Sequence, residues 1–346
     1  MDKRSLRKGM LLGIGNPLLD VSACVGHDIL HKYEMKPNNA ILASDIHKPL
    51  CNELIHEHNA EFIAGGSVQN TLRVAQWILN VPGVTVFFGS VGEDKYANIL
   101  EQHALASGVN VKYQYNKTEP TGTCAVLITD KHRSLCADLS AANHFTKDHI
   151  ELPENRKFIE DAEYYYISGF FLTVNPATAM EIATFSLEHN RPFIMNLSAP
   201  FISQFYKEPL MDLIPYIDIL MGNDTEAEAF SKEQNLGTTD LKEIALKITE
   251  LPKKNSKRSR MCIITCGANP VILAHDGKIK EFPVQDVPAD KVVDTNGAGD
   301  AFAGGFLAQL VLGRPIDICI NCGIYTAIEV IQRSGCTFEG VANFNP

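Results

Sequence analysis

The sequence has no excess of basic charge. Its 346 residues include 31 Lys and Arg against 41 Asp and Glu, so the net charge is −10. Nucleic-acid binding relies on clustered basic side chains that neutralise phosphates, so we expect no nucleic-acid partner. No run of about eighteen residues is both uncharged and mainly apolar, so we expect no transmembrane helix and no membrane partner. Asn16, Pro17 and Asp20 interrupt the first apolar segment, which predicts no signal peptide.

The cysteines also show no spacing pattern typical of a disulfide framework. The nine cysteines are an odd number and lie mostly in apolar runs, which favours reduced thiols and a cytoplasmic location. Cys319 and Cys322 form a lone C-x-x-C without a second pair to complete a zinc site, so we interpret them as buried thiols. The basic stretch Pro252–Arg260 is interpreted as a solvated loop, with a nuclear localisation signal as the alternative.

Several common signatures of nucleotide and hydrolase chemistry are absent. There is no G-x-x-x-x-G-K-[ST], no protein-kinase H-R-D set and no G-x-S-x-G. Gly13 and Gly15 match half of a dinucleotide fingerprint, but Leu18 stands where the third glycine belongs. A dinucleotide-dependent oxidoreductase therefore remains only as an alternative function.

Short apolar runs bounded by turn residues recur along most of the chain, and segments with helical periodicity separate several of them. Such runs are typical of buried parallel strands, and the alternation predicts an α/β sheet covered on both faces. The runs are Leu11–Ile14, Val84–Phe88, Tyr164–Ile167, Pro192–Met195, Ile217–Met221, Met261–Thr265 and Val271–Ala274.

Two other regions have shorter and more alternating patterns, which indicate a small antiparallel sheet. We interpret this sheet as a lid formed by residues 20–65 and 113–140. The large domain then comprises residues 1–19, 66–112 and 141–346. The expected lid strands are Asp20–Cys24, Ile41–Ala43, Phe62–Ala64, Thr123–Thr129 and Arg133–Ser140.

The strongest chemical signal is Asp294-Thr-Asn-Gly-Ala-Gly-Asp300. Phe302, Phe306 and Leu310 follow at every fourth position, so a helix is expected to begin near Ala298. Glycines at a helix start let backbone N–H groups approach an anion, and the helix dipole favours negative charge there. The motif therefore predicts a phosphate site, with Asp300 placed to accept a proton from an attacking hydroxyl.

Two further polar groups stand at expected helix starts. In Ala64–Asn70, Ser67 is a candidate N-cap and Asn70 lies in the first turn, where its amide can bind sugar hydroxyls. Asn223 and Glu226 are three residues apart after an apolar strand. Their oxygen atoms suit Mg²⁺ held through water, although a simple helix cap explains the same pattern.

Together these motifs, in this order, resemble the ribokinase (PfkB) family of sugar and nucleoside kinases. The resemblance spans residues 11–338 and implies a three-layer α/β/α sandwich with a small antiparallel β-sheet lid. The segments Gly169–Val174 and Asn196–Phe205 resemble the branch that transfers the γ-phosphate of ATP to the ribose 5′-hydroxyl of adenosine, giving AMP. ATP and Mg²⁺ are the implied cofactors, adenosine and ATP the small-molecule partners, and a monomer the expected state.

The resemblance also implies roles for individual residues. Asp300 would be the base, Gly297, Ala298 and Gly299 the anion hole, and Arg133 a positive charge over the phosphates. The nucleoside would contact Asn16, Asp20, Gly66, Ser67, Asn70, Cys124, Leu135, Leu139, Phe171 and Phe201. ATP would lie along Asn223, Thr265, Gly267, Asn296, Ile324 and Ala327, and Asn223 and Glu226 would organise Mg²⁺ through water. A kinase for another nucleoside or sugar, and a silent nucleoside sensor, remain as alternatives.

Overall fold

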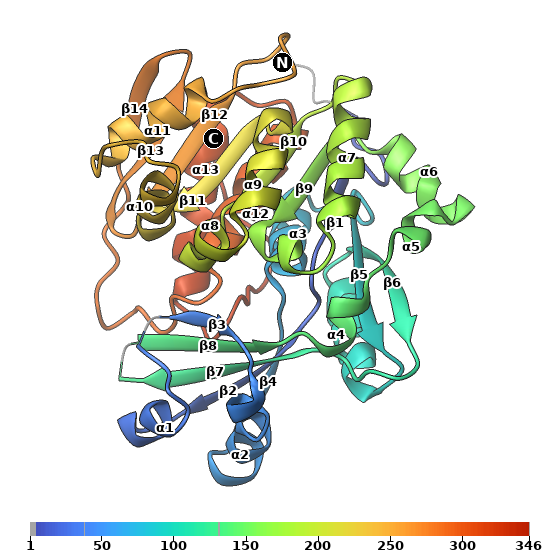
Figure 1. Ribbon diagram of the computed structural model, residues 1–346, viewed down its shortest axis with the longest axis vertical. Helices are drawn as coiled ribbons and strands as arrows, with labels where there is room; N and C mark the ends of the chain where they lie inside the picture. The colour runs from blue at the N-terminus through green and yellow to red at the C-terminus, as the bar shows by residue number, and fades with distance from the viewer. Residues whose placement is uncertain (1–4, 38, 131, 346) are drawn as a thin grey trace.

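The computed structural model describes residues 5–37, 39–130 and 132–345. Its large body is built on a nine-stranded sheet in the order β14-β13-β12-β11-β10-β9-β1-β5-β6 (Figure 1). In chain order these strands are β1 (Leu11–Ile14), β5 (Thr85–Gly92), β6 (Asn110–Asn116), β9 (Tyr164–Ser168), β10 (Phe193–Asn196), β11 (Ile219–Asn223), β12 (Met261–Cys266), β13 (Asn269–His275) and β14 (Lys278–Phe282).

Seven neighbouring strands of this sheet are parallel, as their apolar runs predict; in sheet order they are β6, β5, β1, β9, β10, β11 and β12. Strands β13 and β14 are antiparallel, so the prediction of a parallel strand at Val271–Ala274 is wrong. The reason is the connection: β12 ends at Cys266 and β13 begins at Asn269, and a parallel pair needs a crossover of a dozen or more residues. These two strands extend one edge of the sheet.

Helices cover both faces of this sheet because alternate strand side chains enter two separate cores. Leu12 and Ile14 pack into one core, and Leu11 into the other. The first core is covered by α5 (Lys147–Glu151), α6 (Pro153–Asp161), α7 (Pro176–Glu188), α8 (Pro200–Phe205), α9 (Lys207–Leu213), α10 (Asp224–Glu233) and α11 (Leu241–Glu250). The second is covered by α3 (Ser67–Leu79), α4 (Lys95–Ala106), α12 (Ala298–Val311) and α13 (Ile316–Ile331). The three-layer α/β/α arrangement is confirmed.

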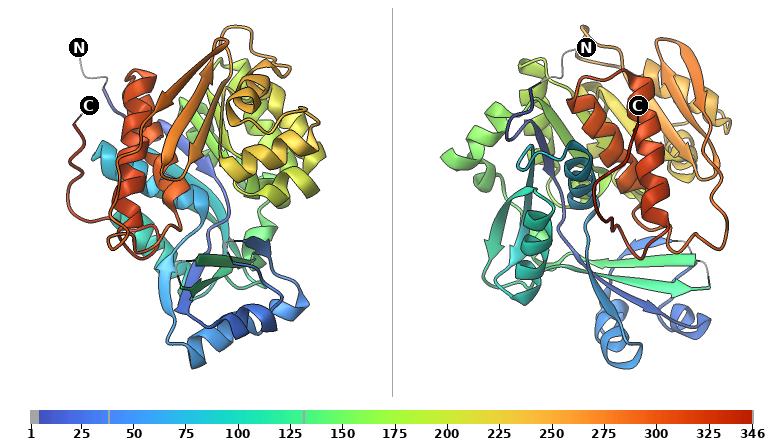
Figure 2. Two further views of the ribbon diagram at one scale, coloured as in Figure 1. Left: turned by 90° about the vertical axis from the view of Figure 1, so that its left-hand side faces the viewer. Right: turned by 180° about the vertical axis from the view of Figure 1, so that it is seen from behind.

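The lid lies against one end of the large body, at the bottom of both views in Figure 2. Its five-stranded sheet has the order β3-β8-β7-β2-β4. The strands are β2 (Leu19–Cys24), β3 (Ala40–Leu42), β4 (Glu61–Ala64), β7 (Thr123–Thr129) and β8 (His132–Asp138). Pairs β2–β4 and β7–β8 are antiparallel, but β2–β7 and β3–β8 are parallel, so the lid sheet is mixed rather than antiparallel throughout.

Helices α1 (His27–Lys32) and α2 (Leu50–Glu57) pack on one face of the lid sheet, and Cys136 belongs to that core. Leu135, Ala137 and Leu139 pack on the opposite face with Leu18 and Cys124. Side chains along Arg133–Ser140 therefore alternate between the two faces, as the alternating sequence pattern predicts, and Leu135, Ala137 and Leu139 line the cavity beside the large body. Within the described ranges the structure also has short 3₁₀ segments, η1 (Asp45–His47), η2 (Ser140–His144), η3 (Gly169–Thr173) and η4 (Ile214–Tyr216).

The chain passes four times between the large body and the lid: from β1 to β2, from β4 to α3, from β6 to β7 and from β8 to η2. Strand β6 pairs with β5 as far as Asn116. Residues 113–116 therefore belong to the large sheet, and the domain boundary expected at 113 lies further along the chain. The cause is a continuous strand that the sequence pattern does not mark as ending.

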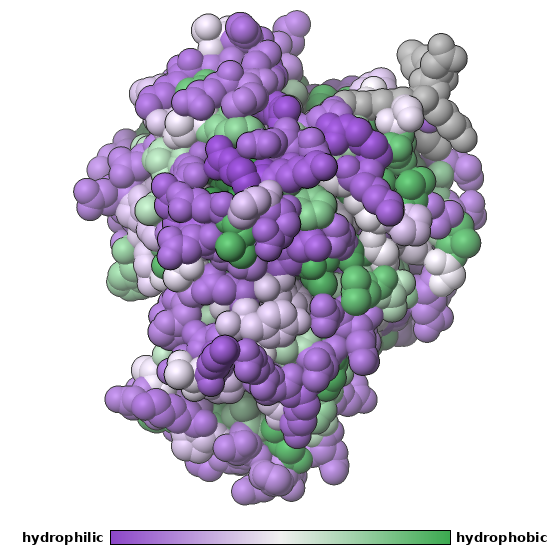
Figure 3. All heavy atoms as spheres, turned by 90° about the vertical axis from the view of Figure 1, so that its right-hand side faces the viewer, coloured by the Kyte–Doolittle hydropathy of each residue, from purple (hydrophilic) through white to green (hydrophobic). Residues whose placement is uncertain are grey.

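Hydrophilic residues dominate the surface in Figure 3, and apolar ones are scattered over it. Phe205, at 77% exposed, is among the few large apolar side chains that stand out in solvent. Among the described residues, no helix is both long and apolar enough to cross a membrane.

Candidate active site

A cavity of about 300 Å³ lies between the lid and the large body, beside the carboxyl ends of the parallel strands. Ligands in open α/β sheets bind at this edge. Most of the residues expected at the site line this cavity: Asn16, Asp20, Gly66, Ser67, Asn70, Cys124, Leu135, Leu139, Phe201, Asn223, Glu226, Thr265, Asn296, Gly297, Gly299 and Asp300.

The amino end of α12 faces the cavity. Gly297 precedes the helix with φ +78°, a conformation that favours glycine. The first i to i−4 hydrogen bond runs from Ala301 N–H to Gly297 O, so the N–H groups of Gly299 and Asp300 precede the helix ladder. Ala298 N–H donates to Thr295 O at 3.3 Å, so this amide, expected in the anion hole, is engaged within the turn.

Gly299 leaves open space beside these amides. A Cβ added at this position would meet no heavy atom within 4 Å. Since the residue lines the cavity, the missing side chain keeps room for an anionic group at the positive end of the helix. The predicted phosphate site thus has both the donors and the space that it needs.

Asp300 is held at the cavity wall by two side chains from α3. Ser67 Oγ donates to Asp300 Oδ1 at 2.7 Å, and Asn70 Nδ2 donates to Asp300 Oδ2 at 3.1 Å. Burial raises the pKa of Asp300 to about 6, and these two hydrogen bonds oppose the rise. Ser67 is the first residue of α3 and Gly66 its N-cap, so the predicted capping role of Ser67 is wrong. Its hydroxyl holds the carboxylate instead.

Asp20 is a second buried carboxyl group in the same cavity. Burial raises its pKa to about 8, and the nearby negative charges of Asp300 and Asp294 add to the effect, while Arg73 opposes it. Gly65 makes the position possible, because a Cβ there would lie under 3.0 Å from both carboxylate oxygens of Asp20. Gly66, with φ +91°, opens α3 beside it. These residues place a polar, poorly solvated group where a sugar would enter.

Apolar side chains form another part of the cavity lining, and Cys124 stands beside Asp20 on the neighbouring strand. Leu135, Leu139 and Cys124 come from the lid, and Phe201 comes from α8. Near them, Asn16 Nδ2 donates to Phe170 O at 3.3 Å, while the buried Asn16 Oδ1 has no hydrogen-bond partner among the described residues. Buried polar atoms are normally paired, so this oxygen is available to a donor on a ligand.

Phe171, expected at the nucleoside, does not line this cavity. It is fully buried in the large-body core and stacks edge-on against Phe145 with ring centroids 5.7 Å apart. Its neighbour Phe170 lines the cavity in its place. Adjacent side chains of the 3₁₀ segment η3 point in different directions. The sequence therefore predicts that one of the two phenylalanines faces the cavity, but it does not show which one.

Asn223 and Glu226 form a capping box at the start of α10. Asn223 Oδ1 accepts Glu226 N–H at 2.8 Å, and Glu226 Oε2 accepts Asn223 N–H at 3.0 Å. Asn223 Nδ2 also donates to Glu226 Oε1 at 2.9 Å, and burial raises the pKa of Glu226 to about 7. Each carboxylate oxygen can accept a further hydrogen bond, so the pair fits Mg²⁺ held through water better than direct ligation.

Arg133 does not line the cavity, contrary to the role expected over the phosphates. Its Nε donates to Asp294 Oδ1 at 2.9 Å, and its Nη2 donates to Val293 O at 2.8 Å. The lid thus uses this side chain to contact the segment that leads into α12. The sequence motif does not reveal this, because it shows no partner for the arginine.

The residues expected along ATP are only partly brought together. Thr265, at the end of β12, lines the cavity, whereas Gly267 does not. Ile324 is buried in the core between α12, α13 and the sheet, and Ala327 packs against the same core. Both residues face apolar neighbours. An apolar helical pattern in the sequence therefore could not show whether they belong to the core or to a binding surface.

Several cavity residues were not predicted from the sequence. Ala137 shares the lid face of Leu135 and Leu139 and could have been found by that alternation. Asn196 and Ser198 lie in the segment Asn196–Phe205 but carry no distinctive pattern, and Ser198 adopts φ +73°. The remaining unpredicted residues are Leu18, Ala40, Ile41, Leu42, Ser168, Phe170, Thr173, Met221, Gly222, Thr295 and Phe302.

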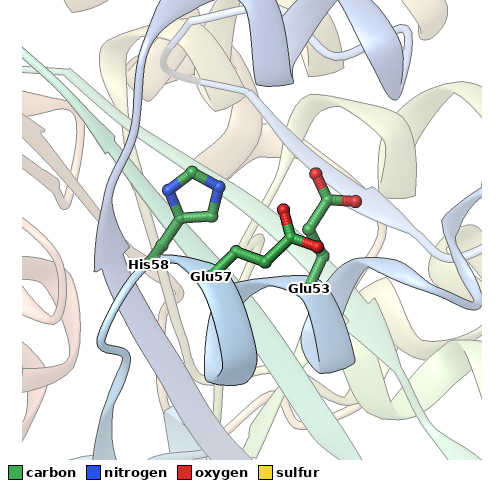
Figure 4. A group of neighbouring side chains, drawn as sticks. All are labelled: Glu53, Glu57 and His58. Carbon is green, nitrogen blue, oxygen red and sulfur yellow. The ribbon is translucent and has the colours of Figure 1, made fainter.

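Other candidate features lie apart from this cavity. Glu53, Glu57 and His58 gather near the end of α2 in the lid, with potential ligand atoms within 4.8 Å of one another (Figure 4). Glu53 already accepts hydrogen bonds from Lys32 and Tyr33 at 2.5 Å each, so this is a surface ion-pair cluster.

The basic stretch is largely used within the fold. Lys253 and Arg258 pair with Asp218, at 2.6 and 3.2 Å, and Arg260 donates to carbonyl oxygens, among them Ile217 O and Ile248 O. The stretch is therefore a structural loop rather than a free run of positive charge.

The dinucleotide alternative loses its structural basis. Gly13 lies in β1, and the chain after Gly15 enters lid strand β2 instead of a helix. A dinucleotide fingerprint needs the helix whose amino end binds pyrophosphate.

A helix start with free amides and open space, a buried carboxylate beside it and a lid over the cavity together define a small-molecule kinase. Comparison with known proteins agrees. Residues 30–341 match the family described as pfkB family carbohydrate kinase. The chain belongs to this family.

Within this family, the chain is similar to several adenosine kinases. Adenosine kinase 2 of Arabidopsis thaliana is 49% identical over 337 residues, which cover 97% of this chain and 98% of that protein. The crystal structure of Anopheles gambiae adenosine kinase with P1,P4-di(adenosine-5) tetraphosphate is 56% identical, with TM-score 0.96 and coverage of 98% and 100% of the two chains. Adenosine kinase from Schistosoma mansoni, solved with 2-fluoroadenosine, is 35% identical, with TM-score 0.94 and coverage of 97% and 99%.

Proposed function

We propose that this chain is an ATP:adenosine 5′-phosphotransferase that produces AMP. The observation that carries the proposal is the position of Asp300, which lines one cavity together with Gly299, Asp20 and Asn70 and accepts a hydrogen bond from Asn70 Nδ2. A primary hydroxyl bound against that wall faces a carboxylate on one side and a phosphate site on the other. The adenosine kinases of A. thaliana, A. gambiae and S. mansoni named above support adenosine as the acceptor.

Substrate binding follows from the polarity of the cavity. The carboxyl group of Asp20 and the amide of Asn70 suit the two ribose hydroxyls, which donate and accept hydrogen bonds. The apolar lid residues Leu135 and Leu139 suit the flat face of a purine, and the unpaired Asn16 Oδ1 suits a donor on the nucleoside. Ribose is thereby oriented with its 5′-hydroxyl toward Asp300.

The chemical step needs little covalent participation by the protein. Asp300 accepts the hydroxyl proton as the phosphoryl group is transferred, and the N–H groups of Gly299 and Asp300 stabilise the charge on that group. One such donor is typically worth about 3–4 kcal/mol and a general base roughly 10²–10⁴ in rate. Closure of the lid excludes water, which would otherwise accept the phosphoryl group.

Mg²⁺ supplies charge neutralisation for the ATP phosphates when it is bound, and we propose that Asn223 and Glu226 hold it through water. Their hydrogen-bonded pair fixes two oxygen-bearing groups at the cavity wall. Thr265 and Asn296 line the same side and are proposed to contact ATP. A monomer remains the expected state, and a cytoplasmic location, which fits the nine free cysteines, remains the expected location.

A nucleoside panel tests the proposal. Initial rates with Mg-ATP are measured on adenosine, inosine, ribose and fructose, with AMP formation followed by chromatography. We expect the highest kcat/KM for adenosine. Faster phosphorylation of inosine or of a free sugar would favour the alternative of a kinase for another nucleoside or sugar, and no transfer to any acceptor would favour a silent sensor.

A further inference from the structure

Asp294 is a buried carboxylate that contacts the lid and the catalytic turn at once. Its Oδ1 accepts Arg133 Nε from lid strand β8 at 2.9 Å and the backbone N–H of Asn296 at 2.8 Å. Its Oδ2 accepts the backbone N–H of Gly335 at 2.9 Å, from the segment after α13. One side chain therefore joins three separate segments, and the Asn296 bond reaches into the turn that opens α12.

The Arg133 side of the contact is equally well defined. The two side chains are 10% and 2% exposed, and Arg133 Nη2 also donates to Val293 O at 2.8 Å. The planar guanidinium thus binds two consecutive residues of the large body, so the orientation of the Arg133 side chain is fixed as well as the position of its charge. Loss of either partner of such a buried pair leaves the other charge uncompensated.

Resting on the proposed function, we propose that Asp294 is a positioning residue for phosphoryl transfer and that Arg133 acts through it. The Asn296 N–H bond sets the turn that aims the amides of Gly299 and Asp300. The Arg133 bond adds a charged partner to the two backbone N–H donors of that carboxylate, and it does so only while the lid is docked. Lid docking and the arrangement of the amides therefore favour each other, as two coupled equilibria must.

This coupling acts on the step in which geometry matters most. Preorganised donors lose their effect when they are misplaced, and a shift of about 1 Å can cost roughly 10²-fold in rate. It also explains why Arg133 lies outside the lining of the cavity although it comes from the lid. Its effect on catalysis is expected to reach the phosphates through Asp294.

A double-mutant cycle tests the proposal. Asp294→Asn, Arg133→Gln and the double variant are compared with the wild type in kcat at saturating adenosine and Mg-ATP. We expect each single change to lower kcat at least about 10-fold, while the dissociation constant for adenosine changes less than about 3-fold. The double variant should lie within about 3-fold of the worse single variant. Multiplied effects mean independent roles and overturn the proposal, as does unchanged kcat in Asp294→Asn.

Asp218→Asn is the matched control for loss of stability. Asp218 is also a buried carboxylate, 4% exposed, and it pairs with Lys253 and Arg258 and accepts Phe193 N–H away from the cavity. We expect it to lower the melting temperature as Asp294→Asn does but to leave kcat within about 2-fold. An equal loss of kcat in the control would assign the effect to general loosening and overturn the proposal.

Arg133→Lys keeps the cycle informative if Asp294→Asn does not fold. Lysine keeps a positive charge beside Asp294 but cannot reproduce the planar fork, so kcat should fall between the wild type and Arg133→Gln. Activity in Arg133→Lys no better than in Arg133→Gln contradicts the proposal. The wild-type assay separates the two hypotheses: without adenosine phosphorylation the proposed function fails, whereas an active wild type with multiplied effects refutes only the coupling.

Discussion

The pH dependence of turnover should report the ionisation of Asp300. A base must be ionised to accept a proton, and burial raises the pKa of Asp300 to about 6. For a single group with that pKa, the ionised fraction is about 0.9 at pH 7 and about 0.1 at pH 5, so kcat/KM should fall roughly tenfold over this range. The assay is AMP formation at saturating Mg-ATP between pH 5 and 8, with rates corrected for the Mg-ATP concentration at each pH.

Two substitutions connect this profile to Asp300 rather than to the other carboxyls of the cavity. The 2.7 Å hydrogen bond from Ser67 to the carboxylate lowers the pKa of Asp300. Ser67→Ala removes this bond, so the pKa should rise and the acid limb should move to higher pH. Asp300→Asn removes the base while keeping a similar shape, and kcat should fall at least about 10² while adenosine binding stays within a few-fold.

Three results would refute this reasoning. They are near-normal turnover in Asp300→Asn, a flat profile in the wild type, and an acid limb that Ser67→Ala leaves in place. The last result would assign the limb to another group, such as Glu226, whose pKa burial raises to about 7.

Further predictions concern the other groups of the cavity. 2′-Deoxyadenosine should be a poorer substrate, by up to roughly 10⁴ in kcat/KM, because a missing hydroxyl leaves buried polar groups unpaired; equal values for the two nucleosides contradict this. Asp20→Asn should stabilise the protein at pH 8 by at least about 1 kcal/mol in urea unfolding. The pKa of Asp20 is raised to about 8 in the folded state, so between about pH 4 and pH 8 the group ionises in the unfolded protein but stays protonated in the folded one. Stability therefore falls as pH rises over this range, and the stabilisation gained by Asp20→Asn should be smaller at pH 5 than at pH 8. Gly299→Ala should keep the melting temperature, since its Cβ meets nothing within 4 Å, yet lower kcat at least about 10-fold by filling the phosphoryl space; full activity would show that this space is not used.

Local chemistry made part of the site predictable. The helix start at Ala298 is confirmed because glycines, an acidic first turn and a four-residue apolar period all specify the same boundary. The parallel strands were predictable for a similar reason, since burial on both faces demands continuous apolar runs.

Information that depends on distant partners was not available from the sequence. Phe170 and Phe171 have the same side chain, and only the turn after β9 decides which one enters the core. The antiparallel turn into β13 and the parallel pairs in the lid depend on which segments meet, not on their composition. The family resemblance implied a position for Arg133 over the phosphates, and its contact with Asp294, 161 residues away, could not be inferred from the local sequence.

The four passages between the bodies also determine the order in which the protein can fold. Strand β2 hydrogen-bonds to β7, with Leu19 opposite Thr123, and β3, at the edge of the lid sheet, pairs with β8. During synthesis β2 and β4 can pair with each other, but the other edge of β2 and the strand β3 must wait for β7 and β8, which follow β5 and β6 of the large body. Such long-range pairing slows folding and leaves strand edges exposed in the meantime. Until β7 and β8 emerge, the open edges of β2 and β3 therefore expose the nascent chain to aggregation and to binding by chaperones.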